Sequence, residues 1–356
     1  MLALILTGCV SHRDLAFAPK PDPNAAIQHV FVATSRQKST PVQGFSAARA
    51  TGLGYAAFTV SIPPDHTPGR IEWPGKKPDA AKDFVTVGAE DLSDAARFRA
   101  ALNGELSRLP KGKRDIVVFV HGYNTSFAEG LYRVAQLSQD LNVGGVKLAY
   151  SWPSAGRESG YAYDRDSAVF ARDGLQELLE ILATSQADNV LLVAHSMGAL
   201  LTVETLRQIS IAGHSNTYSK LSGVVLMSPD IDVDLFKSQL ARIRPLPKPF
   251  VIFSSRKDRA LRVSALITGE TQRLGNLRSV DDLKGLGVLV VDLTNFKADG
   301  DWLNHSSIAT SPNLMAILKS LPDMDKRLAP RVSGATIAFP GFTKLQKDGY
   351  WLVPNF

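Results

Sequence analysis

One short segment of the sequence has the composition of a turn that presents a nucleophile. An apolar run at residues 190–194 leads into His195-Ser196-Met197-Gly198, and a helical pattern follows at once. Ala194 and Gly198 are small, as a tight turn between a strand and a helix requires. A helix N-terminus beneath the serine would favour negative charge that develops there. We therefore predict that Ser196 is a nucleophile; the alternative is an ordinary strand-to-helix turn.

A His-Gly pair ends an earlier apolar run, in the sequence Phe119-Val120-His121-Gly122-Tyr123-Asn124. This turn resembles the oxyanion loop of α/β hydrolases, in which a backbone N–H just after the glycine points toward the substrate carbonyl. The resemblance assigns the two oxyanion donors to the backbone N–H groups of Tyr123 and Met197. His121 itself is expected to hold the loop by hydrogen bonds rather than to act as a base.

The base is found partly by elimination among seven histidines. In α/β hydrolases the chain order is serine, acid, histidine, so the base must follow the last main strand. Only His305 meets this condition, in a polar loop between a predicted strand and a predicted helix. A neutral imidazole there could take the proton of Ser196 and return it to the leaving group.

The acid has two candidate positions. Asp258 follows the apolar run at residues 250–254, where this architecture most often supplies the acid, and we predict it for that role. The alternative position lies one strand earlier and contains Asp230, Asp232 and Asp234. Asp258 could also be an ordinary residue of a solvated turn, because Arg and Lys surround it.

A narrower resemblance rests on segments outside these motifs. They are residues 30–36, Val60-Ser61-Ile62-Pro63, residues 66–72, Tyr150-Ser151-Trp152-Pro153-Ser154 and residues 161–166. They are similar to a bacterial group of α/β hydrolases of unknown function over roughly residues 27–321. The resemblance implies an α/β-hydrolase fold and a nucleophile, but no substrate, because fold does not decide function.

Short apolar runs alternate with amphipathic segments from residue 115 onward, which predicts an α/β fold with a mostly parallel sheet and helices on both faces. The predicted strands are residues 116–120, 146–152, 190–194, 223–227, 250–254 and 288–292. The predicted helices are residues 91–109, 126–141, 166–183, 199–209, 233–243, 261–267 and 313–318. Residues 29–34 and 55–62 predict an antiparallel extension at the sheet edge, and 335–339 and 350–353 a final strand pair or a surface wrap.

The composition is that of a globular protein. Of 356 residues, 44% are hydrophobic and 21% charged, and no stretch after the first few residues approaches the roughly 20 apolar residues of a membrane span. The formal charge is +6, but no aromatic-and-basic motif accompanies it, so we do not expect nucleic-acid binding. We expect a signal and tether at residues 1–26, a hydrolase domain at 27–321 and a tail that packs on the domain at 322–356.

The single cysteine, Cys9, excludes an internal disulfide and follows a short apolar run in Leu6-Thr7-Gly8-Cys9. This sequence resembles the cleavage box of bacterial lipoproteins, in which the cysteine becomes acylated. Residues 11–24, with three prolines, would then be an extended tether. The resemblance implies a lipid-anchored protein of the bacterial cell envelope that faces the periplasm; an accidental apolar terminus would leave a cytoplasmic protein.

Three aromatic residues follow the second main strand: Trp152, Tyr161 and Tyr163. They could line an acyl or alcohol pocket, although packing of a loop explains them equally well. The connection from Met227 to Phe250 has room for one helix only, which favours an open site.

These features favour a carboxylesterase that forms an acyl-enzyme on Ser196 without a metal or organic cofactor. A serine at this position argues against epoxide hydrolases and dehalogenases, which use aspartate there. A lipase or an amidase could use the same residues, whereas export would disfavour a thioesterase acting on coenzyme A esters. The alternative from another class is an envelope lipoprotein that kept the fold to bind partners and lost catalysis.

Overall fold

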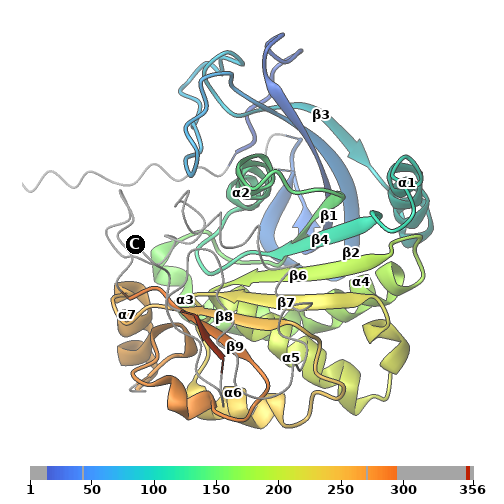
Figure 1. Ribbon diagram of the computed structural model, residues 1–356. Helices are drawn as coiled ribbons and strands as arrows, with labels where there is room; N and C mark the ends of the chain where they lie inside the picture. Colours follow the sequence, from blue (N-terminus) through green and yellow to red (C-terminus); the bar gives the residue numbers. More distant parts are fainter. Residues whose placement is uncertain (1–13, 42–43, 270–271, 295–349, 353–356) are drawn as a thin grey trace, which may run out of the picture.

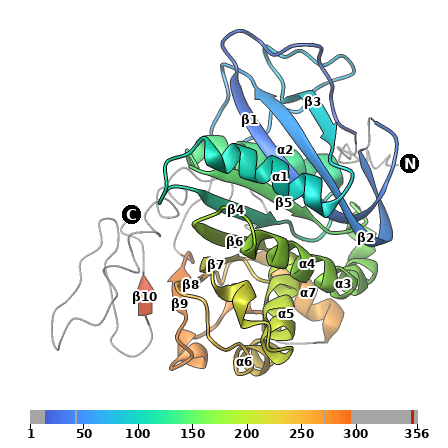
Figure 2. The same ribbon diagram turned by 90° about the vertical axis from the view of Figure 1, so that its right-hand side faces the viewer.

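The computed structural model describes residues 14–41, 44–269, 272–294 and 350–352, which form one large sheet with helices around it (Figures 1 and 2). The strands are β1 (Ala26–Lys38), β2 (Phe45–Ile62), β3 (Val85–Asp91), β4 (Asp115–Val120), β5 (Val146–Ser151), β6 (Asn189–His195), β7 (Leu221–Met227), β8 (Phe250–Ser254), β9 (Leu289–Asp292) and β10 (Tyr350–Leu352). The α-helices are α1 (Ala95–Ser107), α2 (Phe127–Asp140), α3 (Tyr161–Phe170), α4 (Arg172–Ala183), α5 (Met197–Ile211), α6 (Val233–Leu240) and α7 (Arg259–Thr268).

The strand order is β10-β9-β8-β7-β6-β4-β5-β1-β2-β3. All neighbouring pairs from β10 to β1 are parallel, whereas β2 pairs antiparallel with β1 and β3 pairs antiparallel with β2. The predicted parallel sheet with an antiparallel edge is therefore confirmed. Because β9, β8, β7, β6, β4, β5 and β1 run parallel, their carboxyl ends lie at one edge of the sheet. The candidate site residues lie at this edge.

The core consists of one apolar layer on each face of the sheet. Alternate strand residues point to opposite faces, so Val118 and Leu192 pack on one side and Phe119 on the other. The first layer is completed by apolar side chains of α1, α4, α5 and α6, and the second by those of α2. Such strands, buried on both faces, read as continuous apolar runs, which is why they were recognisable in the sequence.

Two elements differ from the sequence-based expectations. The helix expected at residues 166–183 is two helices, α3 and α4, which meet at Ala171, where the hydroxyl of Tyr150 donates to the Ala171 carbonyl at 2.6 Å. Strand β3 was not predicted, because only Val85 and Thr86 of its seven residues are buried at the sheet edge. The helix expected at residues 313–318 and the strand at 335–339 lie outside the described residues.

The segment around Leu15 lies against the sheet edge. Leu15 is buried, and Ala16 accepts from Thr86 N at 2.6 Å, while Ala16 N donates to the hydroxyl of Tyr132 at 2.9 Å. Residues 11–24 therefore do not form an extended tether along their whole length, because the chain already packs on β3 and α2 at Leu15.

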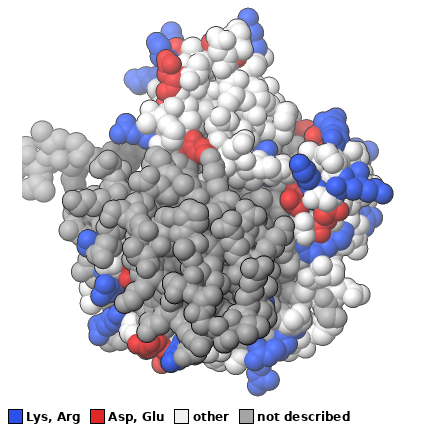
Figure 3. Space-filling model, in the orientation of Figure 1, with Lys and Arg blue, Asp and Glu red and all other residues white. Residues whose placement is uncertain are grey.

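The surface has charges of both signs. On the face shown in Figure 3, basic and acidic side chains of the described residues lie close to one another at the upper left and on the right. Among the described helices, none combines the length and the apolar character needed to cross a membrane.

Candidate active site

Ser196 lies in a strained turn between β6 and α5. Its backbone has φ 53° and ψ −122°, a conformation that non-glycine residues adopt only at a cost of about 1 to 3 kcal/mol. Hydrogen bonds on both sides hold the turn: Ser196 N donates to Met227 O at 2.9 Å, and Asp230 N donates to Ser196 O at 3.1 Å. Ser196 therefore stands at the carboxyl edge of the sheet, at the N-terminus of α5. Its exposed fraction is 2%. The connection after β7 holds one α-helix, α6, as expected.

Two glycines allow the His-Gly turn to pack directly on this serine turn. A β-carbon on Gly198 would lie 2.2 Å from the carbonyl oxygen of His121. A β-carbon on Gly122 would lie 2.9 Å from Cβ of Ser196. Both distances are too short for a side chain, so each position requires glycine. The two turns that carry Tyr123 and Met197 are consequently neighbours in the structure.

His121 is a buried residue of the loop rather than an exposed base. Nδ1 lies 2.9 Å from the carbonyl oxygen of Gly122, and Nε2 lies 3.0 Å from that of Trp152. Burial and the nearby Arg36 guanidinium lower the pKa of His121 to about 3, so the ring is neutral. Its neutral ring carries one N–H and donates to one of these carbonyls. These contacts agree with the structural role that we expected for His121.

Trp152 packs against the His-Gly loop and is hydrogen-bonded to it. It is fully buried, its indole stacks on the His121 ring with centroids 4.9 Å apart, and Nε1 donates to the His121 carbonyl at 2.7 Å. Of the two roles considered for Trp152, the structure favours packing of the loop over lining a substrate pocket.

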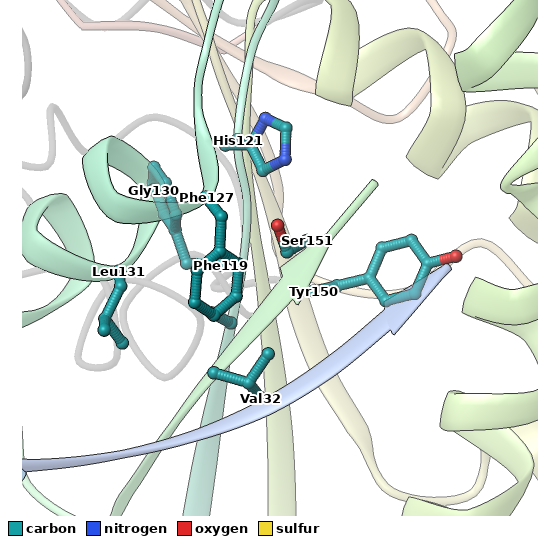
Figure 4. Close-up of a pocket in the computed structure, with 9 residues that line it drawn as sticks. Val32, Phe119, His121, Phe127, Gly130, Leu131, Tyr150 and Ser151 are labelled. Atoms are coloured by element: carbon teal, nitrogen blue, oxygen red, sulfur yellow. The ribbon is translucent and has the colours of Figure 1, made fainter. Parts of the chain in front are cut away.

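A narrow hollow lies behind His121, between α2 and strands β1, β4 and β5 (Figure 4). Figure 4 shows Phe127 and Leu131 of α2 facing Phe119 and Val32 of the sheet. The hollow has no room for the centre of a water molecule. It is a packing defect in the apolar layer and not a substrate site.

Arg36 is a buried cation at the end of β1. Nη2 donates to Thr125 O at 2.8 Å, Nη1 to Ser154 O at 3.0 Å, and Nε to Ser151 Oγ at 2.9 Å. Burial lowers the pKa of Arg36 to about 10, an effect that the carboxylate of Asp164 opposes, so the guanidinium remains charged at neutral pH. Arg36 thus connects the loop after β4 with the loop after β5.

Asp164 of α3 binds the same two loops from the other side. Its fully buried carboxylate accepts from Asn124 N at 3.0 Å, Ala155 N at 2.6 Å and Ser154 Oγ at 2.6 Å. Asn124 has φ 55°, in the left-handed region, which asparagine adopts more readily than most residues with a side chain. The Asp164 carboxylate therefore holds the turn directly after Tyr123.

The acid candidates fall into different environments. Asp258 is fully buried just after β8 and caps α7 by accepting from Leu261 N at 3.0 Å. Asp232 caps α6, and Asp234 is exposed beside Lys237. These contacts are helix caps and a surface ion pair, and of these three aspartates only Asp258 is buried, beside the carboxyl edge of the sheet.

Asp230 belongs to a buried polar cluster that also contains Tyr161, Ser264 and Arg273. Oδ1 accepts from Ser264 Oγ at 2.6 Å and lies 3.2 Å from Arg273 Nε, and Oδ2 accepts from the Tyr161 hydroxyl at 2.9 Å. Burial, followed by the Asp230 charge, raises the pKa of Tyr161 to about 12, so this phenol stays protonated. Both carboxylate oxygens of Asp230 are therefore engaged by neighbouring side chains.

The two tyrosines proposed for the pocket occupy different places. The Tyr161 ring meets the Tyr123 ring edge-on at 5.4 Å, which places Tyr161 beside the His-Gly turn. The Tyr163 hydroxyl donates to Ala47 O at 2.9 Å, and Arg49 lies over its ring at 4.7 Å. Tyr163 is thus held by the long strand β2, away from the contacts that surround Ser196.

Most of the described histidines are engaged elsewhere. His29 lies near Thr59 at the amino end of β1, His66 lies between Glu72 and Asp140, and His214 lies beside Glu180. His195 precedes the serine, and its Nδ1 would be 2.8 Å from a β-carbon on Gly122. His305 and Cys9 lie outside the described residues. Their predicted roles therefore remain predictions.

Among the described residues, no cluster of three or more His, Cys, Asp or Glu side chains could hold a metal ion.

A parallel sheet in this strand order, with a serine in a strained strand-to-helix turn at its carboxyl edge, defines the α/β-hydrolase class of proteins. The model of the α/β hydrolases of unknown function (DUF900) matches residues 95–321, which is more than half of the chain. The protein belongs to that family. Residues 26–38, which supply Arg36, lie outside the matched segment.

The solved structures that match this chain include several hydrolases of low sequence identity. An esterase from Rhizomucor miehei is 12% identical, with 84% of this chain and 85% of that chain covered and a TM-score of 0.37. Aspergillus fumigatus lipase B is 15% identical, with 65% and 58% covered and a TM-score of 0.39. A dienelactone hydrolase from Anabaena variabilis is 16% identical, with 61% and 87% covered and a TM-score of 0.37. No curated protein matches the chain in sequence.

Sequence reasoning did not single out Arg36, Asp164 or Arg273 as residues of the site. Arg36 and Asp164 appeared only within segments that resembled the family. The available signal for Arg36 was a charged residue directly after the apolar strand residues 30–33. Asp164 and Arg273 lie in segments of mixed polarity and carry no comparable local signal.

Proposed function

We propose that this α/β hydrolase is a serine hydrolase that cleaves carboxylic ester bonds through an acyl-enzyme on Ser196. The observation that carries the proposal is the strained conformation of Ser196, φ 53° and ψ −122°, at the junction of β6 and α5. Such strain persists only where surrounding contacts impose it, and it is typical of functional sites. In this turn the strained residue is a serine, whose hydroxyl becomes a nucleophile when a base removes its proton.

In the proposed reaction, Ser196 Oγ attacks the ester carbonyl carbon while its proton passes to the imidazole of His305. The tetrahedral intermediate collapses, the C–O bond to the alcohol breaks, and His305 returns the proton to the leaving alkoxide. Water then attacks the acyl-enzyme with the same proton relay and releases the carboxylic acid and free Ser196. The balance requires only ester and water.

The developing oxyanion would be bound by the backbone N–H groups of Tyr123 and Met197. The close packing of Gly122 on Ser196, where an added β-carbon would be 2.9 Å away, supports this assignment because it brings the two turns together. Met197 is the first residue of α5, so the helix dipole favours negative charge at its N–H. Removing one such donor typically costs about 100-fold to 1,000-fold in turnover.

Asp258 is the favoured acid. The carboxylate of Asp230, the alternative, is engaged by Ser264, Arg273 and Tyr161 and would have to leave these partners to orient His305. Asp258 is buried in the loop after β8, next to the loop after β9 from which the chain continues toward His305. A buried aspartate there would hold the imidazole in one tautomer and stabilise its charged form.

The proposed substrate class is a carboxylic ester, since Ser196 would form an acyl-enzyme with it. The same residues could cleave a lipid ester or an amide. The competing proposal is a protein that retains the fold and binds partners without turnover.

A fluorophosphonate probe tests the proposal, because it reacts with an activated serine hydroxyl and not with an ordinary one. We expect stoichiometric labelling of wild-type protein at Ser196, identified by peptide mass spectrometry, and no labelling of Ser196→Ala. We also expect turnover of nitrophenyl esters that Ser196→Ala lacks. Absence of both labelling and turnover in folded wild-type protein would favour the binding protein; turnover of anilides but not esters would favour an amidase.

A further inference from the structure

The loop that carries Tyr123 is held at consecutive peptide groups by buried polar side chains. The peptide between Gly122 and Tyr123 has its carbonyl oxygen 2.9 Å from Nδ1 of His121. In the next peptide, Asn124 N donates to Asp164 Oδ2 at 3.0 Å, and the Tyr123 carbonyl accepts from Thr125 Oγ1 at 3.2 Å. The Tyr123 N–H therefore lies between a carbonyl group that contacts the His121 ring and a peptide group whose N–H and carbonyl are both hydrogen-bonded.

The following two peptides are held in the same way. Thr125 N donates to Ser154 Oγ at 3.0 Å, and Ser154 Oγ donates to Asp164 Oδ2 at 2.6 Å. The Thr125 carbonyl accepts from Arg36 Nη2 at 2.8 Å. Ser154 thus connects the anion and the cation, because its own carbonyl accepts from Arg36 Nη1 at 3.0 Å.

We propose that Asp164 and Arg36 are positioning residues that hold the backbone N–H of Tyr123 where the oxyanion of the substrate forms. This inference rests on the proposed function, since it concerns the same site. Neither side chain touches the substrate in this assignment. Asp164 accepts from Asn124 N and Arg36 donates to the Thr125 carbonyl, and both side chains are almost completely shielded from water, so their hydrogen bonds keep the loop in place.

Asp164→Asn is the informative change. The amide nitrogen is a donor, so it cannot replace both oxygens toward Asn124 N, Ala155 N and Ser154 Oγ. Asp140→Asn is the matched control, because Asp140 is also a buried carboxylate that accepts from a backbone N–H, at Gly69, but it lies at the C-terminal end of α2 beside His66. Concentrations of competent sites are normalised by titration with the fluorophosphonate.

We expect Asp164→Asn to lower kcat per competent site by about 10-fold to 100-fold with KM within about threefold, whereas Asp140→Asn leaves both near wild type. The second readout compares an ester with the matching thionoester, whose C=S is a poor acceptor in an oxyanion site. The preference for the ester should shrink in Asp164→Asn, because both substrates then lack the aligned donor. A purely structural defect would reduce both rates equally, and an unchanged ratio would overturn the inference.

Hydrogen exchange decides the positioning independently of turnover. Amides of residues 119–127 should exchange faster in Asp164→Asn than in wild type, and at the wild-type rate in Asp140→Asn. Unchanged exchange in this segment would refute the positioning role even if the esterase proposal held. If wild-type protein hydrolyses no ester, the proposed function is wrong, but the exchange rates still test whether Asp164 positions the loop.

If Asp164→Asn does not fold, Ser154→Ala is the second variant. It removes the link between Thr125 and Asp164 without altering charge and should change the ester kinetics and the exchange rates in the same direction.

Discussion

Gly198 and His121 approach each other so closely that a β-carbon on Gly198 would lie 2.2 Å from the His121 carbonyl oxygen. That oxygen also accepts from Trp152 Nε1 at 2.7 Å, so it cannot easily move away. The contact joins the N-terminus of α5 to the loop after β4, and it fixes the distance between the two turns of the candidate site.

We predict that Gly198→Ala destabilises the protein by about 1 to 3 kcal/mol and abolishes turnover, because backbone rather than a flexible side chain opposes the new methyl group. Urea unfolding and an ester assay check this. Gly104→Ala in α1 is the control: nothing lies within 4 Å of its added β-carbon, so alanine should stabilise the helix by roughly 0.5 to 1 kcal/mol. Equal behaviour of the two variants would contradict the prediction.

Asp258→Asn should lower kcat by about 100-fold, or ~3 kcal/mol of barrier, with little change in KM. Asparagine is as good an N-cap as aspartate, so the α7 cap at Leu261 N should survive and stability should change little. Steady-state kinetics and a thermal melt separate the two effects.

Asp230→Asn should behave in the opposite way. It removes the charge that faces the buried Arg273, so the free energy of unfolding should fall by roughly 3 to 5 kcal/mol, while kcat per competent site falls much less than in Asp258→Asn. If Asp230→Asn is instead the variant with the crippled kcat and normal stability, the acid lies one strand earlier than we assign it.

His66 should make stability depend on pH. Its ring lies 2.7 Å from Glu72 and 2.9 Å from Asp140, and these carboxylates raise its pKa above 6.5 against the opposing effect of burial. A raised pKa means that the protonated ring stabilises the fold below pH 6.5 and that this stabilisation is lost as the pH rises through the folded-state value. The hydrogen bonds of Asp140 lower its pKa below 3.8 even though burial opposes this shift. The stabilisation that the Asp140 carboxylate contributes is therefore lost as the pH falls below 3.8 and through its folded-state pKa.

We therefore expect His66→Gln to cost roughly 1 to 3 kcal/mol near pH 5.5 and clearly less near pH 9. Urea unfolding of wild type and variant at both pH values gives the two differences. His214→Gln is the control, since His214 contacts Glu180 with a half-exposed side chain, and should change stability little at either pH. A cost for His66→Gln that is independent of pH would show that packing, not charge, explains the role of His66.

We propose that Cys9 is acylated in the native host and anchors the protein to a membrane of the cell envelope. Mass spectrometry of protein from that host should find a lipid on Cys9. The Cys9→Ser variant should no longer be found in the membrane fraction. Because Leu15 and Ala16 are buried, a version that begins at Asp14 should remain stable and active, whereas one that begins at Ala25 should lose stability. An unmodified Cys9 in an intact chain would disprove the anchor.

The sequence by itself predicted the parallel sheet, its antiparallel edge and the serine turn. These features depend on short-range patterns: continuous apolar runs for strands buried on both faces, and small residues at Ala194 and Gly198 for a tight turn. It failed at β3, where only two residues are buried, and at Ala171, where the Tyr150 hydroxyl from a distant strand meets the helix break.

Only the tertiary structure showed that Arg36, Asp164 and Arg273 lie beside the residues of the candidate site. Arg36 lies there because β1 runs parallel beside β5, which brings residue 36 next to Ser151 and Ser154. Arg273 distinguishes the two acid candidates because it packs on Asp230, 43 positions earlier in the chain. Such neighbours are set by strand order and register, which depend on the free energy of the whole fold, whereas periodicity within a short window records only which face of one element is buried.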